Sequence, residues 1–324
     1  MKAWQCGMTP GREDMRLTDL PEPSTASDDV LIDIHATAVN FSDLLMAEDK
    51  YQVKPPRPFV PGQEIAGVVV SAPKGAGFAP GDRVMSKVTS GGFAERISVP
   101  AHMPIAIPEN LSFVQAAAMP VAYITAMVGL SECSTVNPGD WVLVHAASGA
   151  TGLAALEVAV AMGARVIAAA SSPDKRAIAA AHGAEILIDY TAADWVAKVK
   201  DATGGAGARI IFDPVGGDVG EANLRAIARD GTILIVGFAS GRIQALAANR
   251  LMLKRAAARG VSWNHDLDAD MLARCNQRIM AMLQKGQLSP EISVYPGLTA
   301  LPQALDDLAA RRSTGKLVLD LKAG

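Results

Sequence analysis

A glycine-containing turn follows a short apolar run near the middle of the chain. Residues 142–152 read Val-Leu-Val-His-Ala-Ala-Ser-Gly-Ala-Thr-Gly, and residues 153–162 continue as an apolar segment. The run predicts a buried strand and the segment a helix, with an Ala-x-Gly-x-x-Gly turn between them. At such a turn, Gly149 lets the backbone approach a pyrophosphate, and Gly152 lets the helix pack closely on the strand. The free N–H groups of the helix start attract negative charge, so the pattern favours a dinucleotide.

The turn alone leaves a structural interpretation open. Ala147 replaces the first glycine of the usual pattern, and glycine turns between strands and helices also occur without a ligand. A second apolar run at 165–170 begins about twenty residues after the turn, which is the spacing of a βαβ unit. This context raises the dinucleotide interpretation above the structural one.

Composition excludes several other classes of function. The 324 residues are 50% hydrophobic, 19% charged and 5% aromatic, as in an ordinary α/β protein, and the length allows two domains. A net charge of −3 without a long basic run gives no electrostatic reason to expect nucleic acid or an anionic membrane as a partner. The three cysteines, Cys6, Cys133 and Cys275, are far apart, which argues against a disulfide framework and fits a reducing compartment. We expect a cytoplasmic protein, because the first residues lack the apolar core of a signal peptide.

The chain has three regions with different patterns of apolar residues, and together they must position the turn. Residues 1–120 hold short strand-like runs separated by Pro and Gly, which predicts a β-rich, partly open barrel. Residues 121–262 alternate uniformly apolar strands with Ala-rich helices, which predicts a parallel sheet covered on both faces; the strands are expected at 142–145, 165–170, 186–189, 210–213 and 232–236. Residues 263–324 carry amphipathic helices near 270–285 and 301–311 and a last strand at 316–321, and we expect this segment to return to the first domain.

Short motifs elsewhere in the chain form one consistent set. They are Val39-Asn40-Phe41-Ser42-Asp43, Pro61-Gly62-Gln63-Glu64-Ile65-Ala66-Gly67, Gly81-Asp82-Arg83-Val84, Gly91-Gly92-Phe93-Ala94-Glu95, Thr125-Ala126, Phe212-Asp213-Pro214-Val215-Gly216-Gly217, Gly237-Phe238 and Thr314-Gly315-Lys316. With these motifs the chain resembles, from end to end, the zinc-independent medium-chain dehydrogenases/reductases of the quinone oxidoreductase, or zeta-crystallin-like, group. This resemblance implies an α/β protein with a GroES-like catalytic domain, built from the first and last segments, a Rossmann domain inserted between them, and an active site in the cleft.

A catalytic zinc is not expected, although zinc alcohol dehydrogenases share the implied fold. Where those relatives carry a Cys and a Gly-His-Glu, this chain has Ser42 and Gly62-Gln63-Glu64. The structural four-cysteine lobe is also missing, since no Cys lies between residues 6 and 133. Glu64 alone does not make a tetrahedral site, and we interpret it as a buried, hydrogen-bonded carboxylate. We predict no metal.

The end of the second strand of the βαβ unit predicts NADPH rather than NADH. A carboxylate there would bind the ribose hydroxyls of NAD and repel a 2′-phosphate, but the strand ends in Ala170-Ser171-Ser172. Ser172-Pro173-Asp174 fits the N-cap, N1 and N2 positions of the next helix. Ser171, Ser172, Lys175 and, by resemblance, Tyr190 are then placed to contact the phosphate, although Lys175 also fits a solvated helix position. The resemblance implies further cofactor contacts at Asn40, Thr125, Ser148, Gly149, Ala150, Thr151, Gly152, Val215, Gly237, Phe238, Ala239 and Lys316, with Arg312 as another candidate.

Without a metal, the chemistry must come from the nicotinamide hydride, and the protein must stabilise the charge that forms on oxygen. By resemblance, Asn40 offers amide donors, Thr125 offers a hydroxyl, and Tyr51 stands where related enoyl-thioester reductases carry a proton-donating phenol. Packing against Pro55-Pro56 is the alternative role for Tyr51. Leu45 replaces a second tyrosine of some quinone oxidoreductases, and Trp263 and His265 are placed by topology at the border of the cleft.

The favoured function is NADPH-dependent reduction of a quinone or an α,β-unsaturated carbonyl compound. A 2-enoyl thioester reductase is the alternative among enzymes, and a non-catalytic NADPH-binding protein of crystallin or regulatory type is the alternative from another class. The relatives commonly pair through the edge strand of the Rossmann sheet, so we expect a homodimer formed through residues 256–262.

Overall fold

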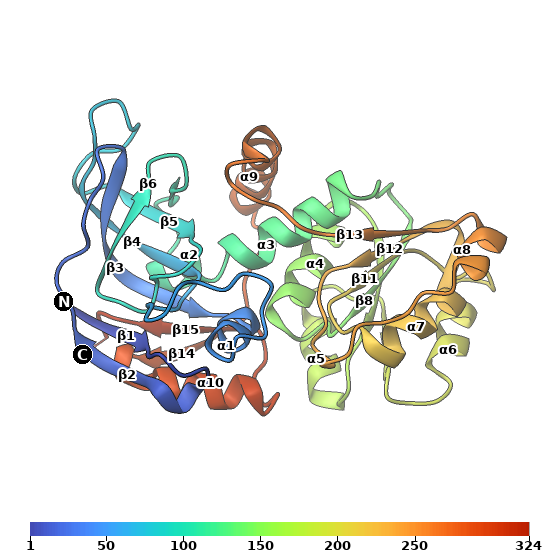
Figure 1. Ribbon diagram of the computed structural model, residues 1–324. Helices are drawn as coiled ribbons and strands as arrows, with labels where there is room; N and C mark the ends of the chain where they lie inside the picture. The colour runs from blue at the N-terminus through green and yellow to red at the C-terminus, as the bar shows by residue number, and fades with distance from the viewer. Residues whose placement is uncertain (324) are drawn as a thin grey trace. The chain divides into compact units, whose positions relative to one another are not determined.

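The computed structural model describes residues 1–323, and the chain forms two compact units (Figure 1). The first unit contains Met1–Val121 and Ile292–Gly324, and the second contains Ala122–Glu291. Residues 263–291 therefore group with the second unit, whereas the sequence placed them with the first. The reason is the packing of helix α9 (Ala269–Gln284) on the short helix η2 (Val128–Glu132), supported by an ion pair of 3.2 Å between Arg274 and Glu132.

Strand β3 (Asp29–Val39) is the centre of the main sheet of the first unit. It pairs antiparallel with β4 (Glu64–Ser71), β6 (Arg96–Pro100) and β15 (Lys316–Asp320). Because Leu317 is in register with Val39, the strand pairing places Lys316 beside the residue that follows β3. The remaining strands are β14 (Ile292–Pro296), β5 (Arg83–Lys87) and β7 (Ile105–Ala106) in the same sheet, and the separate pair β1 (Lys2–Cys6) and β2 (Met15–Asp19).

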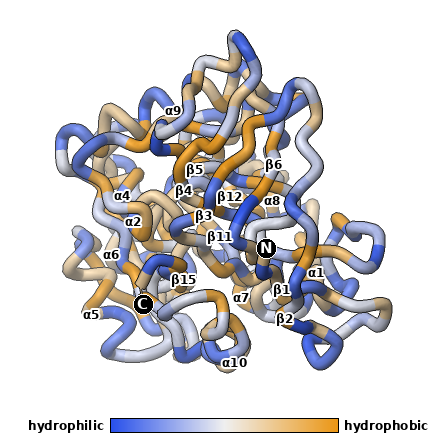
Figure 2. The backbone as a smooth tube through the Cα atoms, turned by 90° about the vertical axis from the view of Figure 1, so that its left-hand side faces the viewer, coloured by the Kyte–Doolittle hydropathy of each residue, from blue (hydrophilic) through white to orange (hydrophobic). Residues whose placement is uncertain are grey.

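Every second side chain of β3 points into the core of the first unit. Val30, Ile32 and Ile34 are fully buried and pack with apolar side chains of β4, β5 and β6. Figure 2 shows hydrophobic stretches around β4 and β5 and hydrophilic loops at the surface. The helices of this unit are η1 (Arg12–Asp14), α1 (Phe41–Ala47), α2 (Phe113–Ala117), η3 (Leu298–Ala300) and α10 (Leu301–Ala309), and α3 (Pro120–Met127) begins in it.

The second unit is a doubly wound parallel sheet. Its strand order is β10 (Ile186–Ile188), β9 (Arg165–Ala169), β8 (Trp141–His145), β11 (Ala208–Asp213), β12 (Ile227–Ile235) and β13 (Ala257–Gly260), and every pairing is parallel. The order reverses between β8 and β11, which is where such sheets bind ligands at the carboxyl ends of the strands. The Rossmann sheet and the GroES-like domain expected from the sequence are confirmed.

Uniform burial explains why these strands are parallel and covered on both faces. Val142, Leu143 and Val144 in β8 are fully buried, as are Ile167 to Ala169 in β9. The covering helices are α4 (Ala150–Ala161), α5 (Pro173–Ala181), α6 (Trp195–Ala202), α7 (Gly217–Ala226) and α8 (Ala248–Lys254). Within residues 1–323, no helix is long and apolar enough to cross a membrane.

Candidate functional site

The glycine turn leads from β8 into the N-terminus of α4. Ala146 has a φ of 48°, and the N–H of Gly149 donates to its carbonyl oxygen at 2.9 Å. Gly149 is the N-cap of α4, so the N–H groups of Ala150, Thr151 and Gly152 have no acceptor within the helix. A Cβ added to Gly152 would lie 2.2 Å from the carbonyl oxygen of Ala146. The geometry supports the role of Gly152 in close packing and presents donors to an anion at α4.

Two further loops meet beside this turn, at the ends of β11 and β12. The carboxylate of Asp213 accepts from the N–H groups of Val215 at 2.8 Å and Gly216 at 3.0 Å. The N–H of Ala239 donates to the carbonyl oxygen of Pro214 at 3.0 Å, and that of Ser240 to Val215 at 2.9 Å. These bonds bring the loop of Val215 together with the loop of Gly237, Phe238 and Ala239, and the cofactor contacts expected of these four residues stay a prediction.

A buried network, which the sequence did not indicate, fixes the same loop. His145 is fully buried, and its Nε2 lies 2.8 Å from Oδ1 of Asn223. The Nδ2 of Asn223 donates to Asp213 at 2.9 Å, which leaves Oδ1 as the acceptor and makes His145 Nε2 the donor. Burial lowers the pKa of His145, so the ring is neutral. His145 is a core histidine, as expected, and it holds Asp213 in place through Asn223.

The end of β9 carries the predicted phosphate contacts. Ser172 is the N-cap of α5 and accepts from the N–H of Lys175 at 3.4 Å, with Pro173 at the start of the helix, so the predicted capping is confirmed. Arg176 was missed: its guanidinium donates to the carbonyl oxygen of Ala170 at 3.0 Å and pairs with Asp189 at 3.2 Å. The sequence could have indicated Arg176 as a phosphate contact, because it directly follows the candidate Lys175. A permanent positive charge therefore lies at the end of β9, and Tyr190 follows Asp189 at the end of β10.

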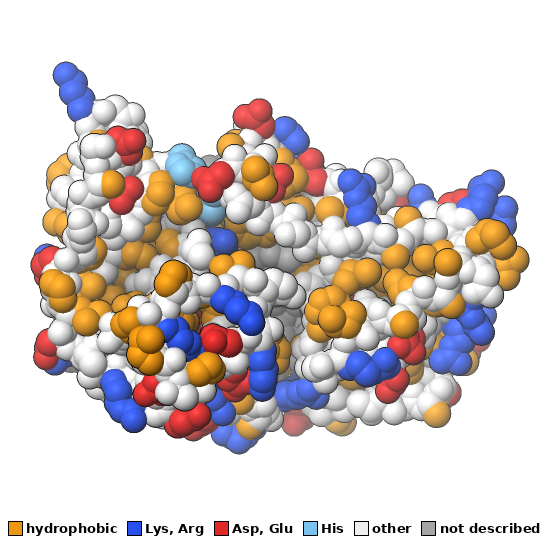
Figure 3. Space-filling view, in the orientation of Figure 1, with side chains coloured by type: hydrophobic (Ala, Val, Ile, Leu, Met, Phe, Trp, Pro, Cys, Tyr) orange, Lys and Arg blue, Asp and Glu red, His pale blue; other side chains and the backbone are white. Residues whose placement is uncertain are grey.

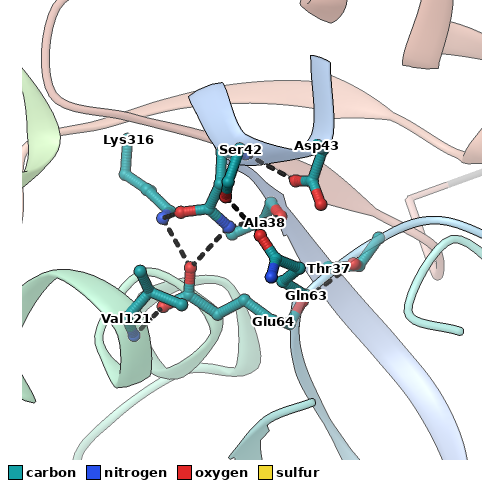
Figure 4. Close-up of polar contacts among 9 residues, drawn as sticks. Thr37, Ala38, Ser42, Asp43, Gln63, Glu64, Val121 and Lys316 are labelled. Carbon is teal, nitrogen blue, oxygen red and sulfur yellow. Dashed lines mark hydrogen bonds and ion pairs between the residues drawn. The ribbon is translucent and has the colours of Figure 1, made fainter. Parts of the chain in front are cut away.

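The first unit gathers Asn40, Glu64 and Lys316 into a buried cluster (Figure 4). The Lys316 ammonium is 2.5 Å from Glu64 Oε2 and donates to Asn40 Oδ1. Asn40 Nδ2 donates to Glu64 Oε2 at 3.2 Å and to the carbonyl oxygen of Ala38 at 3.5 Å. Glu64 Oε1 accepts from the N–H of Val121 at 2.8 Å. Glu64 is thus the buried, hydrogen-bonded carboxylate that the sequence predicts. The side chains of Asn40 and Lys316 bond to Glu64 and to each other.

Asp43 adds a second buried carboxylate to this region. Its Oδ2 accepts from the N–H of Asn40 at 2.8 Å, and its Oδ1 is buried without a partner. Burial raises the pKa of Asp43 from 3.8 to about 7, because hydrogen bonds to Asn40 and the charge of Lys316 offset only part of the desolvation. Asp43 therefore carries a proton for part of the time at neutral pH.

Ser42 and Gln63 contact each other beside the cluster. The Ser42 hydroxyl donates to Gln63 Oε1. The resemblance seen in the sequence implies that these two residues replace zinc ligands of the zinc alcohol dehydrogenases. Among residues 1–323, no group of three His, Cys, Asp or Glu side chains could hold a metal ion. Tetrahedral zinc sites are built from Cys, His and carboxylate ligands, and the absence of zinc stays a prediction.

The remaining predicted catalytic residues lie in different units. Tyr51, in the first, packs half-buried against an apolar cluster that includes Leu44 and Phe59, and burial raises its pKa above 10. Thr125, in the second, accepts at Oγ1 from Trp263 Nε1 at 3.1 Å. Tyr51 is therefore a protonated phenol at neutral pH, and both residues keep their predicted roles as hypotheses.

Comparisons with known proteins agree with this geometry. The alcohol dehydrogenase GroES-like domain matches residues 26–109, and the zinc-binding dehydrogenase family matches residues 150–277. A quinone oxidoreductase-like protein 2 homolog of Nematostella vectensis is 40% identical over 90% of this chain and 82% of its own length. The chain belongs to the quinone oxidoreductase family of medium-chain dehydrogenases/reductases. It is an oxidoreductase, and the resemblance seen in the sequence is confirmed.

Solved structures extend the agreement to the whole chain of this quinone oxidoreductase family member. The quinone oxidoreductase of Thermus thermophilus, solved also in complex with NADPH, is 35% identical with a TM-score of 0.87, covering 99% of this chain and 100% of its own. A structure described as an NAD-dependent alcohol dehydrogenase is 31% identical with a TM-score of 0.91, covering 99% of each chain. Both descriptions name a nicotinamide cofactor, in keeping with the glycine turn at α4.

Proposed function

We propose that this oxidoreductase uses NADPH to reduce a quinone or an α,β-unsaturated carbonyl compound, without zinc. Two observations carry the proposal. The second unit holds a dinucleotide turn at the β8–β11 switch point, and in the first unit Ser42 and Gln63 bond to each other, with no group of three metal-ligating side chains among residues 1–323. Bound NADPH would supply the hydride, and hydrogen-bond donors of the protein would then stabilise the charge on the acceptor oxygen.

Charge at the end of β9 supports NADPH over NADH. Ser171 is exposed there, and no carboxylate ends the strand. The Arg176 guanidinium, anchored on Ala170, adds a donor suited to a 2′-phosphate. Asp189 shares this guanidinium, but one carboxylate leaves other N–H groups of Arg176 available.

The protein's part in the reaction is to bind, orient and stabilise charge. The N-terminus of α4 holds the pyrophosphate, and the loop fixed by Asp213 and His145 supports the cofactor at Val215. When an acceptor carbon receives the hydride, its electron pair moves to oxygen, and hydrogen-bond donors must stabilise that charge. Tyr51 holds a proton that it can give to the product, which a 2-enoyl thioester reductase would also require.

Initial rates with different acceptors test the proposal. Purified protein is given NADPH with phenanthrenequinone or with crotonyl-CoA, and NADH replaces NADPH in the control. We expect faster turnover of the quinone with NADPH. Preference for crotonyl-CoA would identify an enoyl thioester reductase, and tight NADPH binding without turnover of any acceptor would identify a non-catalytic binder.

We further propose a homodimer formed through β13. All residues of this edge strand are exposed, and Met252 and Leu253 of the neighbouring α8 are each 70% exposed. Figure 3 shows hydrophobic side chains gathered over α8. An unpaired strand edge next to exposed apolar side chains suits a two-fold contact. Sedimentation of the protein and of a Leu253→Glu variant, which places a charge on this exposed apolar surface, tests this, since only the native chain should sediment as a dimer.

A further inference from the structure

Gln63 presents a hydrogen-bond donor from which no residue in the described part of the chain, 1–323, accepts. The residue is only 6% exposed, and its Oε1 accepts from Ser42. Within residues 1–323 its NH₂ group has no hydrogen-bond partner, yet it is not among the fully buried unpaired atoms, so it reaches solvent. Figure 4 shows the amide nitrogen turned away from the Ser42 hydroxyl. A donor that is fixed in a largely buried side chain, is not fully buried and has no partner among residues 1–323 is suited to a ligand acceptor.

The backbone holds Gln63 in this orientation. Gly62 has a φ of 101°, and a Cβ there would lie 2.5 Å from the backbone nitrogen of Phe93. The carbonyl oxygen of Gln63 accepts from the N–H of Val88 at 2.8 Å. Because the backbone and Oε1 are both fixed, the direction of the NH₂ group is fixed as well, which is the preorganisation that electrostatic catalysis needs.

The neighbouring amide does not offer the same group. Both hydrogens of Asn40 Nδ2 have acceptors within the protein, at Glu64 and at Ala38. Lys316 spends its ammonium on Glu64 and Asn40 and is buried. Of the amides around this cluster, Gln63 is the one that keeps a donor for a ligand among the described residues.

We propose that the Gln63 NH₂ group donates a hydrogen bond to the carbonyl oxygen of the electron acceptor, with Ser42 as the residue that positions it. The proposal rests on the function proposed above. NADPH would give a hydride to the acceptor and become NADP⁺, the acceptor's π electron pair would move onto the carbonyl oxygen, and that oxygen would take its proton from Tyr51, which regains one from water. Gln63 stabilises that oxygen while it is negative and undergoes no chemical change.

Two substitutions at Gln63 test the contact by steady-state kinetics. Gln63→Met removes the amide, and Gln63→Glu keeps the shape and the acceptor for Ser42 but replaces the donor. Loss of one oxyanion donor lowers kcat by about 10²-fold or more, so we expect a loss of that order in kcat/KM for phenanthrenequinone, mainly in kcat. NADPH affinity, measured by fluorescence titration, should stay within about threefold. The matched control is Gln303→Glu, which makes the same change on the exposed face of α10 and should leave every constant unchanged.

Ser42 is tested by a readout that a structural role would not move. In the native protein, the side-chain NH₂ signals of Gln63 should shift in nitrogen–proton NMR spectra when phenanthrenequinone is added. Ser42→Ala should move these signals without any acceptor and lower kcat/KM about fivefold, and Ser42→Thr, which keeps the hydroxyl, should restore both.

The outcomes separate the two proposals. If the native protein reduces the quinone while both Gln63 variants keep kcat/KM within threefold, the role of Gln63 is wrong and the proposed function stands. Unshifted Gln63 signals on adding an acceptor that is turned over would also overturn it. Absence of quinone turnover in the native protein would overturn the proposed function itself.

Discussion

Replacing Lys316 by Met should strongly destabilise the protein. The side chains of Lys316 and Glu64 are 4% and 0% exposed, and the ammonium lies 2.5 Å from the carboxylate. At an effective dielectric constant of about 20, their attraction is about 7 kcal/mol before the cost of desolvating both ions. That cost offsets most of the attraction, but without the ammonium, Glu64 stays buried as an unpaired charge. Removal of one partner from such a pair costs about 3–5 kcal/mol.

A double-mutant cycle separates this pair from simple packing. Glu64→Gln removes the remaining charge and keeps an acceptor for the N–H of Val121, so the double variant should unfold within about 2 kcal/mol of the native protein. The free energies of unfolding are measured by denaturant titration of all four proteins. A cost under about 1 kcal/mol for Lys316→Met would refute the buried pair and leave the ammonium available for the cofactor contact expected from the sequence.

Three further outcomes follow from individual residues. Because burial raises the pKa of Asp43 to about 7, the folded state keeps a proton that the unfolded state loses above pH 3.8. The free energy of unfolding should therefore fall by about 3 kcal/mol between pH 5 and pH 8 in denaturant titrations, and Asp43→Asn should abolish that fall. A Cβ at Gly152 would lie 2.2 Å from the Ala146 carbonyl oxygen, so Gly152→Ala should lower the melting temperature measured by calorimetry. A Cβ at Gly149 would lie 3.4 Å from the same oxygen, so Gly149→Ala should keep the melting temperature and lower the NADPH affinity measured by binding titration. Arg176→Ala should weaken NADPH binding about tenfold and NADH binding less than threefold; equal losses for both cofactors would remove Arg176 from the phosphate site.

Local patterns were sufficient where neighbours in the chain determine the structure. The apolar run before Gly149 and the helix after it follow from hydrophobic periodicity, and the cap at Ser172 follows from Ser-Pro-Asp. The parallel sheet follows from strands that are apolar throughout.

Long-range pairing produced the features that local patterns missed. Lys316 lies 276 residues from Asn40 and reaches it only because β15 pairs with β3. The Ser42–Gln63 contact and the network of His145, Asn223 and Asp213 likewise join segments that are distant in sequence. Residues 263–291 were assigned to the first unit because nothing local shows that α9 packs on η2.

Zinc-free hydride transfer is the central claim, and the rate of NADPH oxidation by chelator-treated protein tests it most directly. Phenanthrenequinone is the acceptor, and the zinc content of the same preparation is measured. Because no group of three His, Cys, Asp or Glu side chains within residues 1–323 could hold a metal ion, we predict an unchanged rate in protein that holds no stoichiometric zinc. Activity that is lost with the metal and restored by adding zinc would contradict the account.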